Sequence, residues 1–372
     1  MSLPTLYLDA NASEILRPEA REAAVAALDL DGNPSSVHRA GRQARALLEE
    51  ARERIAAAFG ADPAGLVFTS GGTEADALAI LALGAGRRVL IGATEHDAVR
   101  AAAPGAARLP VRPDGTIDPG TLRDALDASA EPALVCLMLA NNETGVLHPI
   151  AELAGLCRDR GALLHVDAVQ AAGRVPVSLA DLGADSLALS GHKLGGPKGA
   201  GALLLRGGTQ GFHLSALIAG GGQERGRRGG TPSLPAIAGF AAAADAACAT
   251  LSRFADLAVL RDRIESAARA QGAVVAGAGA PRLPNTSALV LPGRRADSQL
   301  IALDLAGIAV SAGAACSSGK VSASHVLAAM GFGTGAEQAI RMSLPWNATP
   351  EHADRFIAAY ARMAATPSRL SA

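Results

Sequence analysis

The chain has 372 residues, of which 49% are hydrophobic but only 3% aromatic, and its formal net charge is -1. Acidic and basic residues are interspersed and no apolar run approaches the roughly 20 residues of a membrane-spanning helix, so we expect no nucleic-acid partner and no membrane. The first residues, MSLPTLYLDAN, lack the basic start and long apolar segment of a signal peptide, which predicts a cytoplasmic protein.

Taken in chain order, apolar strands alternate with helices, and the alternation indicates an α/β fold with a mostly parallel sheet. The expected elements of the first part are a short strand in 6–13, helices from Pro18 and over 42–59, a strand, turn and helix over 66–83, strands in 88–99 and 133–145, a helix over 150–161, and strands in 162–168, 185–193 and 201–206. After a loop rich in glycine and arginine, we expect a helical stretch over 236–271, strands of a mixed sheet in 273–279, 286–293 and 307–313, and helices over 298–306 and 351–363.

Polar clusters follow the predicted strands of the first part. They read SGGT, TEH, NNETG, DAVQ and SGHK. Ligands of open α/β sheets bind at the carboxyl ends of the strands, so we expect these clusters to converge on one site.

One lysine stands out in the cluster SGHKLGGPKG. Lys193 directly follows a predicted strand, whereas Lys198 follows a proline and is expected to face a turn. Lys193 is suited to form a Schiff base with an aldehyde cofactor, and Asp167, at the end of another strand, is suited to keep a ring nitrogen protonated. That is the requirement of pyridoxal phosphate chemistry. For a lone aspartate in this position, a helix cap is the more common role.

The other polar residues each have a structural alternative. Thr73 either starts a plain helix or helps its N-terminus bind a phosphate. His96 is either a satisfied polar residue at a strand end or an imidazole that stacks on a cofactor ring and moves protons. Cys316 lies in a loop of small residues, which suits a reactive thiol, whereas the other three cysteines lie in apolar or helical patterns typical of structural cysteines. The cysteines form no CxxC pair, so we expect no metal site.

Read together, the motifs resemble the cysteine desulfurases that supply sulfur for iron–sulfur cluster assembly. These are fold-type I pyridoxal-phosphate enzymes of the class V aminotransferase group. The resemblance spans nearly the whole chain through LDANA, GNPSSVHRAGR, TSGGTEAD, TEHDAV, NNETGVLHPI, HVDAVQAAGRVP, SGHKLGGPKGAGAL, GGGQERGRRGGT, ACSSG, SHVLAAMG and IRMSL. It implies a large domain (14–250) with a mostly parallel seven-stranded sheet, and a smaller α+β domain (1–13 with 251–372) that carries the Cys316 loop.

The resemblance also implies a role for each site residue. The catalytic residues would be Cys316, Lys193 and His96. Pyridoxal 5'-phosphate would be bound by Lys193 as a Schiff base, His96 on the ring, Asp167 at the pyridine nitrogen, Gln170 at the phenolic oxygen, Gly72, Thr73, Ser190 and His192 at the phosphate, Asn142, and Thr231 from the neighbouring subunit of a homodimer. The substrate carboxylate would be held by Asn142 and Arg341.

The activity implied by the resemblance is the removal of sulfur from L-cysteine, giving L-alanine and a persulfide on Cys316. An iron–sulfur scaffold or another acceptor protein would then receive the sulfur. A selenocysteine lyase or another class V aminotransferase-type activity is the alternative enzymatic interpretation. A scaffold that has lost its cofactor is a third, which the presence of Lys193, Asp167, His96 and Gln170 disfavours.

Overall fold

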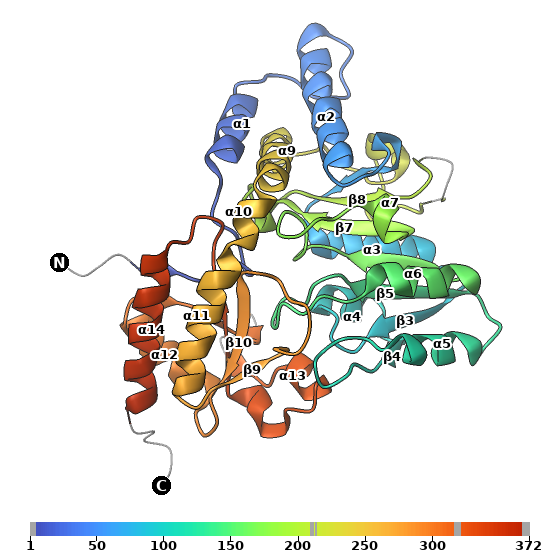
Figure 1. Ribbon diagram of the computed structural model, residues 1–372. Coiled ribbons are helices and arrows are strands. Elements are labelled where there is room, and N and C mark those ends of the chain that lie inside the picture. Colours follow the sequence, from blue (N-terminus) through green and yellow to red (C-terminus); the bar gives the residue numbers. More distant parts are fainter. Residues whose placement is uncertain (1–4, 209–211, 213, 316–320, 367–372) are drawn as a thin grey trace.

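The computed structural model describes residues 5–208, 212, 214–315 and 321–366, and its main element is a seven-stranded sheet (Figure 1). In spatial order its strands are β2 (Val67–Thr69), β8 (Gly201–Leu205), β7 (Ser186–Ser190), β6 (Leu163–Asp167), β5 (Ala133–Met138), β3 (Arg88–Gly92) and β4 (Ala107–Leu109). Strand β8 runs antiparallel to both its neighbours, and the other neighbouring strands run parallel. The predicted mostly parallel sheet is confirmed.

Helices cover both faces of this sheet because its strands are apolar on both sides. Along β5, Val135 and Leu137 pack into one helical layer, whereas Leu134 and Cys136 pack into the other. The first layer contains α1 (Pro18–Leu28), α2 (Arg39–Ala58), α5 (Pro119–Asp127), α6 (Ile150–Asp159), α7 (Leu179–Leu182) and α9 (Leu234–Ala249). The second contains α3 (Gly72–Leu83) and α4 (Asp97–Ala102).

The last third of the chain builds a smaller sheet with its own core. Its strands, in spatial order, are β12 (Ser311–Ala312), β15 (Ala339–Ser343), β10 (Thr286–Val290) and β9 (Val274–Ala276), and α11 (Leu257–Ala270), α12 (Ala296–Leu305) and α14 (Pro350–Ala365) pack against it. The sheet is antiparallel, so the prediction of a mixed sheet is wrong. Two separate strand pairs are β1 (Leu6–Tyr7) with β11 (Ile308–Ala309) and β13 (Ala314–Ala315) with β14 (Val321–Ser322).

Several predicted boundaries shift for local reasons. The stretch 236–271 breaks into α9, α10 (Leu251–Ala255) and α11, because the Thr250 hydroxyl donates back to the carbonyl of Ala246 and ends α9. Helix α2 begins three residues early because the His38 ring accepts a hydrogen bond from the backbone N–H of Gly41. The sequence pattern did not predict β4, α5 or α13 (His325–Ala329).

Within the described ranges, no single helix is long and apolar enough to cross a membrane. The segments Leu234–Ala249 and Leu251–Ala270 meet that criterion only as a pair, and they are bent by 71° relative to each other.

A buried ion pair anchors the glycine- and arginine-rich loop to the large sheet. The guanidinium of Arg52, on α2, donates to both carboxylate oxygens of Glu224 at 2.7 and 2.9 Å, and one of these oxygens also accepts from the backbone N–H of Phe68. Both charged side chains are almost fully buried. Glu224 has a positive φ of 48°, a strained conformation that these contacts stabilise.

We therefore predict that Glu224→Ala lowers the free energy of unfolding by about 3 kcal/mol, because it leaves the buried Arg52 guanidinium with the Leu66 carbonyl and the half-exposed carboxylate of Glu49 as partners. Urea unfolding followed by circular dichroism measures this. The matched control is Asp245→Ala, which breaks the exposed pair with Arg54 and is expected to cost less than about 1 kcal/mol. Equal losses in the two variants would contradict the prediction.

Candidate active site

The strand-end clusters meet at a cavity of about 140 Å³. Its lining residues are Gly72, Thr73, Asp76, His96, Met138, Asn142, Asp167, Val169, Gln170, Ser190, His192 and Lys193. These include every residue expected to bind the cofactor from within the same subunit. A larger cavity of about 480 Å³ lies between α2 and the 222–227 segment and contains none of the predicted site residues.

Lys193 reaches the cavity from a short 3-10 turn, Gly191–Lys193, that directly follows β7. Its Nζ donates hydrogen bonds to the backbone carbonyls of Asn11 at 2.5 Å and Ala12 at 3.1 Å. Burial, together with the nearby charges of Arg341 and Arg174, lowers the pKa of the amine to about 7. A large fraction is therefore neutral and nucleophilic at physiological pH. Lys198 is exposed and does not line the cavity.

Asp167 ends β6 beside two other buried acids. One of its oxygens accepts from the backbone N–H of Val169 at 2.8 Å. Burial, the largest cause, raises the pKa of Asp167 to about 7. Burial raises the pKa values of Asp76 and Glu95 well above their usual range, so we expect these two to be neutral. Of the three acids, Asp167 is therefore the one that can carry a negative charge near neutral pH, where it would stabilise a cationic ring nitrogen.

His165 extends the acid cluster behind the cavity. Its Nε2 lies 3.1 Å from a carboxyl oxygen of Asp76, and its Nδ1 lies 2.8 Å from the Ser186 hydroxyl. Burial lowers the pKa of His165 to about 4, so the ring is neutral. A neutral ring can accept from a protonated Asp76 and donate to Ser186. The sequence analysis did not identify these residues.

His96 lines the cavity at the start of α4. Its Nδ1 accepts from the backbone N–H of Ala98 at 3.1 Å, which leaves Nε2 to carry the ring proton. Burial lowers the pKa of this imidazole, and the neutral ring that results can face an aromatic ligand. His96 therefore caps α4 and lines the cavity at the same time.

One end of the cavity has the features of an anion site. Gly72 and Thr73 form the first turn of α3, whose backbone N–H groups and helix dipole favour negative charge. The Ser190 hydroxyl is buried beside this turn and has no hydrogen-bond partner among the described residues. A Cβ at Gly201 would lie 2.6 Å from the Gly71 backbone, so the absence of a side chain allows β8 to approach the turn.

Arg341 approaches the site from the small sheet. Its Nη2 donates to a carboxylate oxygen of Asp9 at 2.7 Å, and its Nη1 donates to the Asn142 carbonyl at 3.3 Å. The other carboxylate oxygen of Asp9 accepts from the Ser311 hydroxyl at 2.6 Å. Asp9 therefore links the arginine expected to bind substrate to β12, which precedes Cys316 in the sequence.

Thr231 does not line the cavity. Thr231 is exposed, and its hydroxyl accepts from the side chain of Asn33 at 3.4 Å. Cys316 lies outside the described residues.

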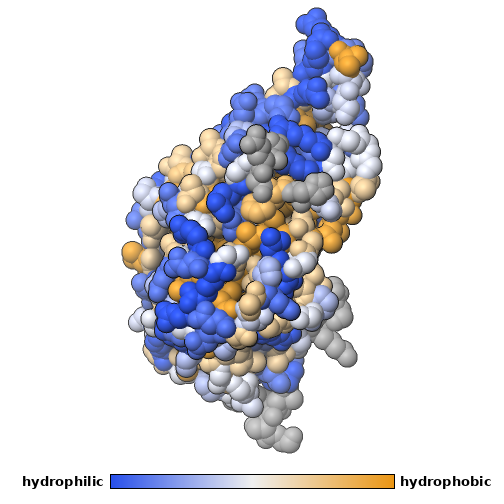
Figure 2. All heavy atoms as spheres, turned by 90° about the vertical axis from the view of Figure 1, so that its right-hand side faces the viewer, coloured by the Kyte–Doolittle hydropathy of each residue, from blue (hydrophilic) through white to orange (hydrophobic). Residues whose placement is uncertain are grey.

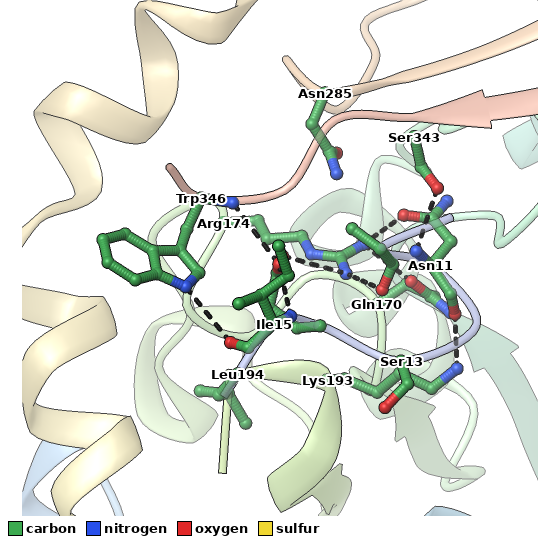
Figure 3. Close-up of polar contacts among 12 residues, drawn as sticks. Asn11, Ser13, Ile15, Gln170, Arg174, Lys193, Leu194, Asn285, Ser343 and Trp346 are labelled. Carbon is green, nitrogen blue, oxygen red and sulfur yellow. Dashed lines mark hydrogen bonds and ion pairs between the residues drawn. The ribbon is translucent and has the colours of Figure 1, made fainter. Parts of the chain in front are cut away.

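Two further buried polar residues that the sequence analysis did not identify are Asn11 and Arg174. Figure 3 shows both in contact with Gln170, at the edge of the site that holds Lys193. The available signal was the position of each within a recognised motif, LDANA and HVDAVQAAGR.

The chain has relatives along almost its whole length. Residues 6–356 match the family model described as aminotransferase class-V. A cysteine desulfurase from Cereibacter sphaeroides is 43% identical over 95% of this chain and 94% of its own length. An IscS-like cysteine desulfurase from Mycobacterium tuberculosis is 38% identical over 91% of both chains.

Solved structures agree with these relatives. The NifS-like protein from Rickettsia africae ESF-5 superposes with a TM-score of 0.89, at 33% identity, over 96% of this chain and 99% of that one. SspA, solved in complex with cysteine, superposes with a TM-score of 0.79 at 28% identity, over 92% of this chain and 99% of that one.

The amine of Lys193 can be tested directly, because the chain has only three lysines: Lys193, Lys198 and Lys320. The double variant Lys198→Arg, Lys320→Arg leaves Lys193 as the only one. With its pKa lowered to about 7, the amine is protonated below that pH and neutral above it. The protein is first treated with hydroxylamine, which removes any aldehyde bound to the amine. We predict that the acylation rate of Lys193 then levels off above pH 7, as measured by mass spectrometry of the Lys193 peptide.

The control is the same variant unfolded in urea, in which the rate is expected to rise up to about pH 10, as for an ordinary lysine. A folded protein that behaved like this control would contradict the buried-amine interpretation.

Proposed function

We propose that this chain, which belongs to the class V aminotransferase family and is a cysteine desulfurase, binds pyridoxal 5'-phosphate in the cavity around Lys193 and transfers the sulfur of L-cysteine to Cys316. The observation that carries the proposal is the meeting of a neutral amine, a buried carboxylate and an anion site in one cavity. Lys193, Asp167 and Ser190 supply these groups, and they come from the ends of neighbouring strands.

The residues around the cavity fit this cofactor. The unpartnered hydroxyl of Ser190 and the first turn of α3, with Gly72 and Thr73, would hold the phosphate, and His192 would help. Asp167 would face the ring nitrogen, and Gln170 the phenolic oxygen. His96 would lie on the ring, with Asn142 beside it. Lys193 would hold the cofactor through Nζ.

When bound, pyridoxal phosphate draws electrons from the Cα–H bond of an amino acid. Asp167 would keep the ring nitrogen protonated, which requires its carboxylate form. The positive charge of that nitrogen would favour this form by lowering the raised pKa of Asp167. Lys193, with its pKa near 7, is matched to removing the Cα proton at neutral pH.

The substrate would be held by its carboxylate. Arg341 has a guanidinium suited to a carboxylate, and its buried Nε has no hydrogen-bond partner in the part of the chain that the structure describes. Asn142 lies next to it. The Cys316 thiolate would attack the sulfur of L-cysteine, forming an S–S bond while the C–S bond breaks. The bond electrons remain on the substrate carbon, which is protonated to give L-alanine.

We propose a homodimer because Thr231 is exposed and thus available to reach the phosphate in a neighbouring subunit. Figure 2 shows the end of the protein that contains α2 projecting from the body. The exposed apolar side chains Val25, Leu28 and Val37, on α1 and just before α2, suit a protein interface at this end.

We also propose a cytoplasmic location, an iron–sulfur scaffold or similar protein as the sulfur acceptor, and domains over 14–250 and over 1–13 with 251–372. The scaffold is suggested by the relatives named as IscS-like and NifS-like. The domain division is supported by two separate hydrophobic cores, one of which joins Leu6 and Leu8 to the C-terminal helices.

The test of the activity is Cys316→Ala. We predict that sulfide release from L-cysteine falls about 100-fold or more because the nucleophile that accepts the sulfur is lost. The absorbance of the bound cofactor is expected to persist, which a spectrum of the purified variant checks.

The matched control is Cys248→Ala, which removes a half-buried thiol on α9 and is expected to leave activity unchanged. Full activity of Cys316→Ala would contradict the role of this thiol. Release of selenide from selenocysteine without sulfide from cysteine by the unmodified protein would favour the selenocysteine lyase alternative.

A further inference from the structure

Arg174 is a buried cation next to the active site but outside the cavity lining. Its Nη1 donates to Oε1 of Gln170 at 2.7 Å and to Oδ1 of Asn11 at 2.6 Å, and its Nη2 donates to the Ala10 carbonyl at 3.1 Å (Figure 3). Burial lowers its pKa to about 10, so it stays charged at neutral pH. Among the described residues, the carboxylate that pairs with it is that of Glu14, 4.0 Å from its Nη2.

These contacts determine which way two amides point. A guanidinium has five donors and no acceptor, so the atom of Gln170 that faces Arg174 must be its oxygen. The Gln170 nitrogen must then point the other way, and it donates to the Asn11 carbonyl at 2.9 Å. That same carbonyl accepts from Nζ of Lys193. The nitrogen of Gln170 is thus held on the side of the amine.

The second amide extends the same pattern toward the small sheet. With its oxygen on Arg174, Asn11 directs its nitrogen to the Asn142 carbonyl and to the Thr286 hydroxyl, each at 3.0 Å. The Asn142 carbonyl also accepts from Arg341. The guanidinium of Arg174 is therefore connected through Gln170 to the carbonyl that Lys193 contacts, and through Asn11 to the carbonyl that Arg341 contacts.

We propose that Arg174 is a positioning residue that fixes the amide of Gln170 with its nitrogen toward the cavity, so that Gln170 can only donate to a bound ligand. The proposal rests on the proposed function, which assigns the phenolic oxygen of the cofactor to Gln170. A donor stabilises an anionic oxygen, whereas the opposite amide orientation would place two oxygens against each other. Arg174 acts through Gln170 and needs no contact with the cofactor.

The first experiment is a double-mutant cycle on cofactor affinity. Absorbance titration of cofactor-free protein with pyridoxal 5'-phosphate gives Kd for the unmodified protein, Gln170→Ala, Arg174→Lys and the double variant. Lysine keeps the charge but cannot bridge Gln170, Asn11 and Ala10 as the planar fork does.

We expect Gln170→Ala to raise Kd about tenfold in the unmodified protein, the effect of losing one hydrogen bond to a charged atom. In the Arg174→Lys background, where the amide is no longer oriented, Gln170→Ala is expected to raise Kd by less than about threefold. Additive effects would overturn the proposal.

A second readout uses cofactor-free protein, so that it does not depend on the loaded enzyme. In the background with Lys193 as the only native lysine, we expect Arg174→Met to raise the pH midpoint of Lys193 acylation, because a nearby cation is lost and the Gln170 oxygen is released. Arg174→Lys, which retains the charge, is expected to keep the midpoint closer to that of the unmodified protein. An unchanged midpoint in Arg174→Met would also overturn the proposal.

Arg17→Lys is the matched control, since Arg17 is another buried arginine near Lys193. It donates to the Leu194 carbonyl and contacts neither Gln170 nor Asn11. We expect this variant to leave both the acylation midpoint and the effect of Gln170→Ala unchanged. If Arg17→Lys reproduced the effects of Arg174→Lys, they would reflect general destabilisation and the proposal would fail.

The two proposals can fail separately. Absence of pyridoxal 5'-phosphate binding by the unmodified protein would sink the proposed function, and the acylation midpoint of Arg174→Met would then decide the role of Arg174 alone. Tight cofactor binding with additive mutations would leave the proposed function intact and overturn the role of Arg174.

Discussion

Parallel strands end at the same edge of a sheet, and the arrangement of this active site depends on that constraint. Strands β6 and β7 are parallel neighbours, so Asp167 and the segment that carries Lys193 leave the sheet side by side. The turn after β2 joins them because β8, the antiparallel strand, pairs with both β2 and β7. Groups far apart in the chain thus share one cavity without any long excursion of the backbone.

Burial in that cavity shifts the acid and the base in opposite directions. It disfavours the charged form of each, so the pKa of Lys193 falls to about 7 and that of Asp167 rises to about 7. At neutral pH each side chain is therefore partly charged and partly neutral. A ligand with a carbonyl group and a basic ring nitrogen can therefore determine the protonation of both.

Sequence patterns predicted the large sheet and its strand-end residues well, because each strand is a local apolar run followed by polar residues. They failed where a partner far along the chain decides the structure. The importance of Asn11 comes from Arg174, 163 residues away, and that of Asp9 comes from Arg341, 332 residues away. Periodicity also could not show that the helical stretch 236–271 is broken at Thr250, since a single side-chain hydrogen bond ends the first helix there.

The choice between lysine and arginine in this chain follows the chemistry of each position. Of 34 basic residues, only three are lysines, so arginine carries almost all the positive charge. Arg174 must stay protonated and donate to several oxygens at once, which a guanidinium does best. The nucleophile must instead lose its proton near neutral pH, which a guanidinium does not do in proteins. Lys193 therefore occupies a position that arginine cannot fill, and the buried arginines beside it help to hold its amine in the neutral form.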